Sequence, residues 1–112
     1  MTFTTKKEGD YSIIAVEGNI ALDNVNEMKK FITPHLENEQ VKGLVINFGK
    51  VDFIDSSGIG LIVSIFKTLQ KRKANFALSQ MSTKNREIFS MTKLDRILSI
   101  CENDAEAIAQ WK

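Results

Sequence analysis

The chain has 112 residues, 43% of them hydrophobic and 26% charged, which predicts one folded domain spanning residues 1–112 and excludes a disordered or collagen-like chain. Its 15 basic and 14 acidic residues give a net charge of +1, so no bulk charge favours nucleic acid or an anionic membrane as a partner. The single cysteine, Cys101, excludes an internal disulfide and a multi-cysteine metal site, and it predicts a cytoplasmic protein. The uncharged stretch 56–66 is about half of the ~20 residues needed to cross a bilayer, so we expect no membrane insertion.

A β-hairpin is predicted at the start of the chain. The segments 3–7 and 11–16 are rich in β-forming residues, and Glu8–Asp10 between them is a turn of hairpin length. Both faces of the second segment are largely apolar, which predicts that both faces are covered. Gly18 and Asn19 are expected to end this strand.

An amphipathic helix is predicted from Leu22 onward, because apolar residues recur at steps of three and four. Pro34 lies inside this pattern, where it removes a backbone donor and clashes with the carbonyl of Lys30. The helix is therefore expected to kink or to end early at Pro34. Its apolar stripe consists of Val25, Met28, Ile32 and Leu36.

The remaining segments alternate between strands and helices. A run of branched apolar residues predicts a central strand over 43–48, a loop follows over 51–55, and a second amphipathic helix precedes the basic tail 71–73. This alternation predicts an α/β domain with a small mixed, mostly parallel sheet, the hairpin at its antiparallel edge and helices packed on it. The later segments are a strand over 74–79, a helix capped by Ser82 and ending near Met91, a strand over 97–101, and a helix over 104–111 that Asn103 and Glu106 open.

The segment 51–60 carries the candidate site. It places Asp55, Ser56 and Ser57 between a buried strand and a helix, where open α/β sheets present their functional loops. In one interpretation these residues are structural: Asp55 or Ser56 caps the helix and Gly58 lets the turn tighten. In the other, a phosphate on Ser56 lies near the positive end of the helix dipole and repels a partner that presents an apolar or acidic surface. The residues alone leave both interpretations open.

The sequence from Asp55 to Gly60 resembles the modified loop in the STAS domains of bacterial anti-sigma factor antagonists. The resemblance extends over nearly the whole chain, since Gly18, Asn47–Phe48 and Phe89–Leu94 also fall where that family has similar residues. One difference is Ala21, which stands where members of the family often have an aspartate, with Asp23 two residues further on. The resemblance implies a small sheet with helices packed on it.

The resemblance also implies a function. In that family a partner that is both anti-sigma factor and serine protein kinase phosphorylates the first serine after the aspartate, and a metal-dependent serine phosphatase removes the phosphate. That role falls on Ser56. The unphosphorylated form binds the anti-sigma factor and frees the sigma factor, whereas the phosphorylated form lets go. The expected contact residues are Asp55, Ser56, Ser57, Gly58, Ile59 and Leu61.

Two other classes of function stay open at this stage. A STAS domain of the same fold can regulate another output or form the cytoplasmic subunit of a membrane transporter. An enzyme finds little support, since Gly58 and Gly60 lack the third glycine of a dinucleotide fingerprint and the only histidine, His35, is predicted on another helix. No cofactor is expected, because one thiol and one imidazole cannot form a closed zinc site.

Overall fold

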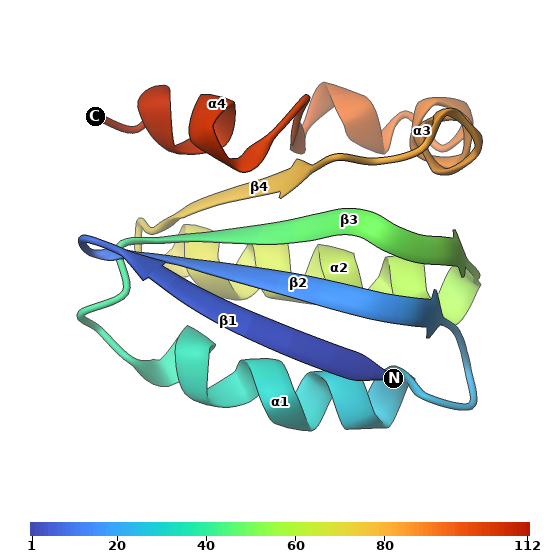
Figure 1. The fold of residues 1–112 in the computed structure, drawn as a ribbon, viewed down its shortest axis with the longest axis horizontal. Helices are drawn as coiled ribbons and strands as arrows, with labels where there is room; N and C mark the ends of the chain where they lie inside the picture. Colours follow the sequence, from blue (N-terminus) through green and yellow to red (C-terminus); the bar gives the residue numbers. More distant parts are fainter.

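In the computed structural model, which describes residues 1–112, the five strands lie in the same order in space as in the sequence, β1-β2-β3-β4-β5. Figure 1 labels the first four of them. β1 and β2 form an antiparallel hairpin, and the other neighbouring strands are parallel. The predicted mixed, mostly parallel sheet is confirmed. The strands are β1 (Thr2–Glu8), β2 (Tyr11–Ile20), β3 (Gly43–Ile54), β4 (Asn75–Ser79) and β5 (Ser99–Cys101).

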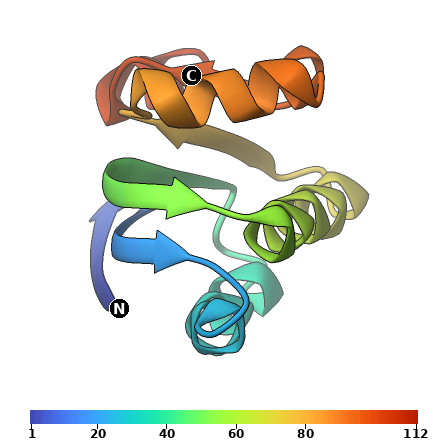
Figure 2. The same cartoon turned by 90° about the vertical axis from the view of Figure 1, so that its right-hand side faces the viewer.

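Helices cover both faces of the sheet. α1 and α2 lie on the same side of it, as Figure 2 shows, and α3 adds Phe89 to the core on that side. α4 covers the opposite face. The helices are α1 (Val25–Glu37), α2 (Ser56–Lys71), α3 (Thr83–Met91) and α4 (Asp104–Ala109), with a short 3-10 helix, η1 (Leu94–Arg96), between α3 and β5.

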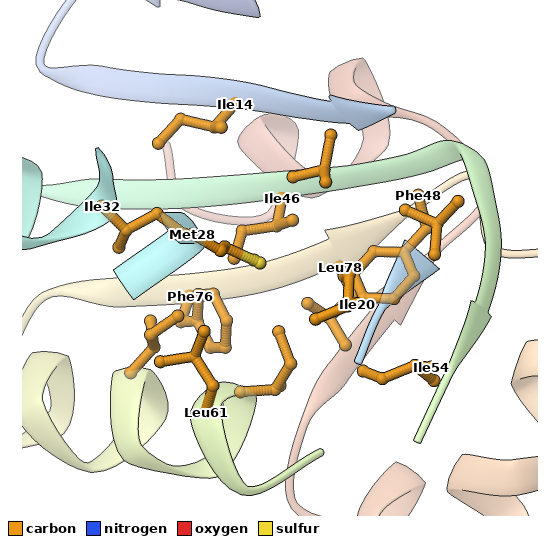
Figure 3. Packing of buried hydrophobic residues seen from close by; sticks show 14 of the residues in the cluster. Ile14, Ile20, Met28, Ile32, Ile46, Phe48, Ile54, Leu61, Phe76 and Leu78 are labelled. Atoms are coloured by element: carbon orange, nitrogen blue, oxygen red, sulfur yellow. The ribbon is translucent and has the colours of Figure 1, made fainter. Parts of the chain in front are cut away.

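The hydrophobic core is divided between the two faces. The larger cluster, of 19 buried residues, joins the sheet to α1, α2 and α3, and ten of its side chains are labelled in Figure 3. The smaller cluster, of six, joins the other face to Ala107 and Ile108 of α4. β2 contributes to both clusters, which confirms that both of its faces are covered. Trp111 packs against the smaller cluster, and its ring meets that of Tyr11 edge-on with centroids 5.3 Å apart.

β2 and β3 are longer than predicted. A break at Gly18 and Asn19 and a loop over 51–55 were expected, but β2 continues to Ile20 and β3 to Ile54. Both predictions are wrong because the two segments pair with each other in parallel, through register shifts on either side of Gly18. Gly18 has a φ of +117°, a conformation that glycine adopts readily, so the strand passes through it.

α1 also differs from its prediction at both ends. It begins at Val25 rather than Leu22, and the side chain of Asn24 accepts a hydrogen bond from the N–H of Ala21 at 2.9 Å. Of the kink or early end expected at Pro34, the early end is wrong, because the helix continues to Glu37. Ile32 is buried and Leu36 packs against the same core, so tertiary contacts on both sides of Pro34 hold the last turn in place.

The C-terminal third follows the predicted order. Ser82 caps α3 and Asn103 caps α4, with hydrogen bonds of 3.1 Å and 2.8 Å from the backbone N–H three residues on. β5 begins at Ser99 rather than at Ile97, because η1 uses the residues just before it. α4 ends at Ala109, two residues earlier than expected.

Candidate functional site

The candidate site lies at the end of the sheet where β2 and β3 stop and α2 begins, the end that faces the viewer in Figure 2. Asp55 has an extended backbone and is the N-cap residue of α2. Its Oδ1 accepts a hydrogen bond from the N–H of Gly58 at 3.0 Å. Of the two capping residues considered from the sequence, Asp55 therefore has this role and Ser56 does not.

Asp55 also joins the site to the turn after β2. Its Oδ2 accepts a hydrogen bond from the N–H of Leu22 at 3.1 Å, and its own N–H donates to the carbonyl of Ile20 at 3.1 Å. The N–H groups of Gly58 and Leu22 stabilise the carboxylate and hold the pKa of Asp55 below its usual value. One side chain thus fixes two segments that are 33 residues apart.

Gly58 is required by a close approach to the end of β2. A Cβ atom at this position would lie 2.3 Å from the carbonyl oxygen of Ile20 and 2.6 Å from Cγ1 of Ile54. The φ of Gly58 is outside the left-handed region, which only Gly9 and Gly18 occupy among the glycines. The glycine therefore serves to bring α2 against the end of β2, and the turn itself does not demand a positive φ.

The predicted contact residues differ in their exposure. Ser56 is exposed as the first residue of α2, while Asp55, Ser57 and Ile59 are half-buried. Leu61 is only 7% exposed and lies among the core side chains shown in Figure 3. The surface available at this loop is therefore formed chiefly by Ser56 and its immediate neighbours.

Two exposed apolar side chains lie next to this loop and were not singled out from the sequence. Leu22, in the turn between β2 and α1, is 74% exposed, and Phe53, near the end of β3, is 38% exposed. Their apolar character is typical of core residues, so the pattern assigned Leu22 to a helix. Beside Leu22, Ala21 is buried and Asp23 is exposed, so Asp23 does not occupy the buried position that Ala21 has.

The electrostatics at the start of α2 combine a helix dipole with acidic side chains. The N-terminus of α2 carries partial positive charge, and Ser56 is the exposed residue at that end. Asp52 is exposed nearby in sequence, and no lysine or arginine occurs between Val51 and Phe66. A phosphate here would meet favourable backbone dipoles and unfavourable carboxylates.

The remaining candidate groups do not assemble into a second site. His35 lies on α1 beside Phe31, with ring centroids 5.8 Å apart. Cys101 is buried, and its Sγ accepts a hydrogen bond from the side-chain amide of Gln110 at 3.3 Å. No cluster of three or more histidine, cysteine, aspartate or glutamate side chains has the arrangement of a metal site. No helix combines the length and the apolar composition needed to span a membrane.

Comparison with known proteins shows the same architecture. The STAS domain family model matches residues 2–107. The anti-sigma-B factor antagonist of Listeria monocytogenes is 31% identical, over 90% of this chain and 88% of that protein. A proposed anti-sigma factor antagonist of Thermotoga maritima is 28% identical over 96% of each chain, and its crystal structure superposes with a TM-score of 0.90 over 96% of this chain and 92% of that chain.

The anti-sigma factor antagonist SpoIIAA has a similar fold. Its unphosphorylated form is 19% identical and matches with a TM-score of 0.74, over 97% of this chain and 96% of that chain. The phosphorylated form of SpoIIAA from Bacillus is 21% identical and matches with a TM-score of 0.76, over 99% of this chain and 100% of that chain. At these identities the likeness concerns the fold alone.

Proposed function

This chain belongs to the STAS domain family, and we propose that it acts as an anti-sigma factor antagonist whose binding is switched by phosphorylation of Ser56. The observation that carries the proposal is the division of roles at the start of α2. Asp55 caps the helix, so the neighbouring hydroxyl of Ser56 is exposed and is not needed to hold the loop. The names of the Listeria and Thermotoga relatives, an anti-sigma-B factor antagonist and a proposed anti-sigma factor antagonist, support the same function.

Phosphorylation would change the surface of the domain and leave its core in place. A phosphate on Ser56 adds about −1.5 to −2 charges at pH 7 beside Asp52 and Asp55. The dipole of α2 offsets part of this charge within the domain, so the fold tolerates it. A partner that covers Ser56 would have to take the phosphate out of water, which opposes binding.

The proposed partner is an anti-sigma factor that is also a serine protein kinase. In the modification step, Oγ of Ser56 attacks the γ-phosphorus of ATP held by the kinase, the bond to the bridging oxygen breaks, and ADP leaves. The hydroxyl proton passes to a base on the kinase. A metal-dependent serine phosphatase then adds water to the phosphoester and returns serine and phosphate.

The loop residues have distinct roles in this proposal. Asp55, Ser56, Ser57 and Ile59 present the contact surface, and Gly58 sets the position of the loop by allowing α2 to approach Ile20. Leu61 is buried, so we assign it to supporting the helix beneath that surface. The alternative of a transporter subunit is not favoured, since the relatives described above are named as antagonists.

The proposal is tested with phosphate-free and charge-mimicking variants of Ser56. Purified Ser56→Ala and Ser56→Asp chains are titrated with each ATP-binding anti-sigma factor kinase of the same host. We expect Ser56→Ala to bind one of them and Ser56→Asp to bind it at least tenfold more weakly. Ser64→Ala and Ser64→Asp are the matched controls, because Ser64 is an exposed serine on the same helix. Both should bind as the wild type does.

The modification itself is measured by mass spectrometry after incubation with the kinase and ATP. The wild-type chain should gain one phosphate and Ser56→Ala should gain none. Equal affinity of Ser56→Ala and Ser56→Asp for every kinase tested would refute control by phosphorylation of this residue.

A further inference from the structure

We propose that Leu22 is a specificity-determining contact, whose exposed side chain enters an apolar pocket on the anti-sigma factor. This inference rests on the proposed function and extends the contact surface beyond the serine loop. Leu22 lies in the turn between β2 and α1, and its side chain does not pack into the hydrophobic core. The partner is identified by its chemistry, an apolar pocket that closes over Leu22 beside Ser56.

The exposure of Leu22 is the first observation behind this inference. Its side chain is 74% exposed although the two residues before it, Ile20 and Ala21, are buried. Four large hydrophobic side chains are exposed in the whole chain: Leu22, Phe53, Met91 and Ile97. Phe53 is two residues before Asp55 in the chain and Leu22 donates its N–H to Asp55, while Met91 and Ile97 belong to the region of α3 and η1. Apolar side chains of this kind are typical of the buried centre of a protein interface.

The turn that carries Leu22 is fixed before any partner arrives. The carbonyl of Ala21 accepts hydrogen bonds from the N–H groups of Asn24 and Val25 at 3.0 Å and 2.8 Å. The N–H of Ala21 donates to the side chain of Asn24, and the N–H of Leu22 donates to Asp55. Binding therefore orders little of the backbone around Leu22, which lowers the entropic cost of the contact.

The same contacts connect Leu22 to the modified residue. Asp55 holds the N–H of Leu22 with one carboxylate oxygen and the first turn of α2 with the other, so a pocket that covers Leu22 also approaches Ser56. The segments 20–28 and 51–66 contain no lysine or arginine that could neutralise a phosphate. Covering Leu22 would then remove an unpaired phosphate from water. The same contact surface thus provides both the affinity of Leu22 for the anti-sigma factor and the release of that partner when Ser56 is phosphorylated.

The experiment compares Leu22→Ala with Ile97→Ala, a matched control that truncates a 57% exposed side chain next to β5. Each unphosphorylated variant is titrated by calorimetry with the purified ATP-binding anti-sigma factor kinase that binds the wild type. We expect Leu22→Ala to bind at least tenfold more weakly and Leu22→Met to bind within threefold of the wild type. Ile97→Ala should stay within twofold. Thermal unfolding of Leu22→Ala should match the wild type, since the side chain is outside the core.

The outcomes separate this inference from the proposed function. If Ser56→Asp releases the kinase and Leu22→Ala binds it within twofold of the wild type, the inference is wrong and the proposed function stands. If the wild type binds no such kinase, both are overturned. A change in the oligomeric state of Leu22→Ala, with unchanged affinity for the kinase, would assign the side chain to contacts between copies and also overturn the inference.

Discussion

Replacing Gly58 with alanine should destabilise the domain, although the same change in a helix normally stabilises it. Alanine favours a helix over glycine by about 1 kcal/mol. At Gly58 the added Cβ would lie 2.3 Å from the carbonyl oxygen of Ile20, so α2 must move away from the end of β2. Overpacking of this kind costs about 1–3 kcal/mol, and loss of the hydrogen bond from Asp55 to Ile20 adds about 1 kcal/mol. The net destabilisation is about 2 kcal/mol.

Gly60 provides the matched control two residues further along the same helix. A Cβ atom there has no heavy atom within 4 Å, so Gly60→Ala should stabilise the domain by about 0.5–1 kcal/mol. With an unfolding entropy of about 2.1 cal/mol/K per residue, 1 kcal/mol shifts the Tm of this chain by about 4 °C. Thermal unfolding followed by circular dichroism should thus show a Tm about 8 °C lower for Gly58→Ala and about 2–4 °C higher for Gly60→Ala. An equal increase of the Tm in both variants would refute the close approach of Gly58 to the carbonyl of Ile20.

Three further predictions concern titration and buried polar contacts. The pKa of Asp55 is lowered in the folded state, so its carboxylate stabilises the domain above about pH 4 and this effect is lost as the pH falls through the folded pKa. The free energies of unfolding in urea of Asp55→Asn and the wild type should therefore become equal in acid. Burial, and then Lys7, lower the pKa of His35, so stability should fall as the pH drops below about 6.5, and His35→Gln should remove that dependence. Asn85→Ala should lower the free energy of unfolding by about 1–3 kcal/mol in urea, because the carbonyl of Val51 loses its buried partner, and an unchanged value would contradict that role.

Local signals in the sequence predicted the caps of α3 and α4 correctly and limited the cap of α2 to Asp55 or Ser56. Asp55, Ser82 and Asn103 each accept a hydrogen bond from the backbone three residues on, and in each case the donor and the acceptor lie within one turn. The opening hairpin is also local, since its turn joins two strands that are neighbours in sequence. Features determined by a few consecutive residues are the ones that sequence patterns describe best.

The errors arose where distant segments meet. Nothing near Gly18 indicates that β2 continues, because the continuation depends on pairing with the end of β3. The hydrogen bond from Leu22 to Asp55 likewise joins residues 33 positions apart, so no periodic pattern contains it. The importance of Gly58 was predicted, but its cause was not, since the neighbouring carbonyl of Ile20 belongs to another strand.

The sequential order of the strands also bears on how the domain assembles during synthesis. Each strand from β2 onward pairs with the one that left the ribosome before it, so the sheet can extend as the chain emerges. The smaller cluster forms later. Ile13, Val45 and Ala77 of the sheet are covered only once Ala107 and Ile108 of α4 have been made. A nascent chain therefore carries an uncovered apolar sheet face until α4 has been made, and this exposed face favours aggregation during that interval.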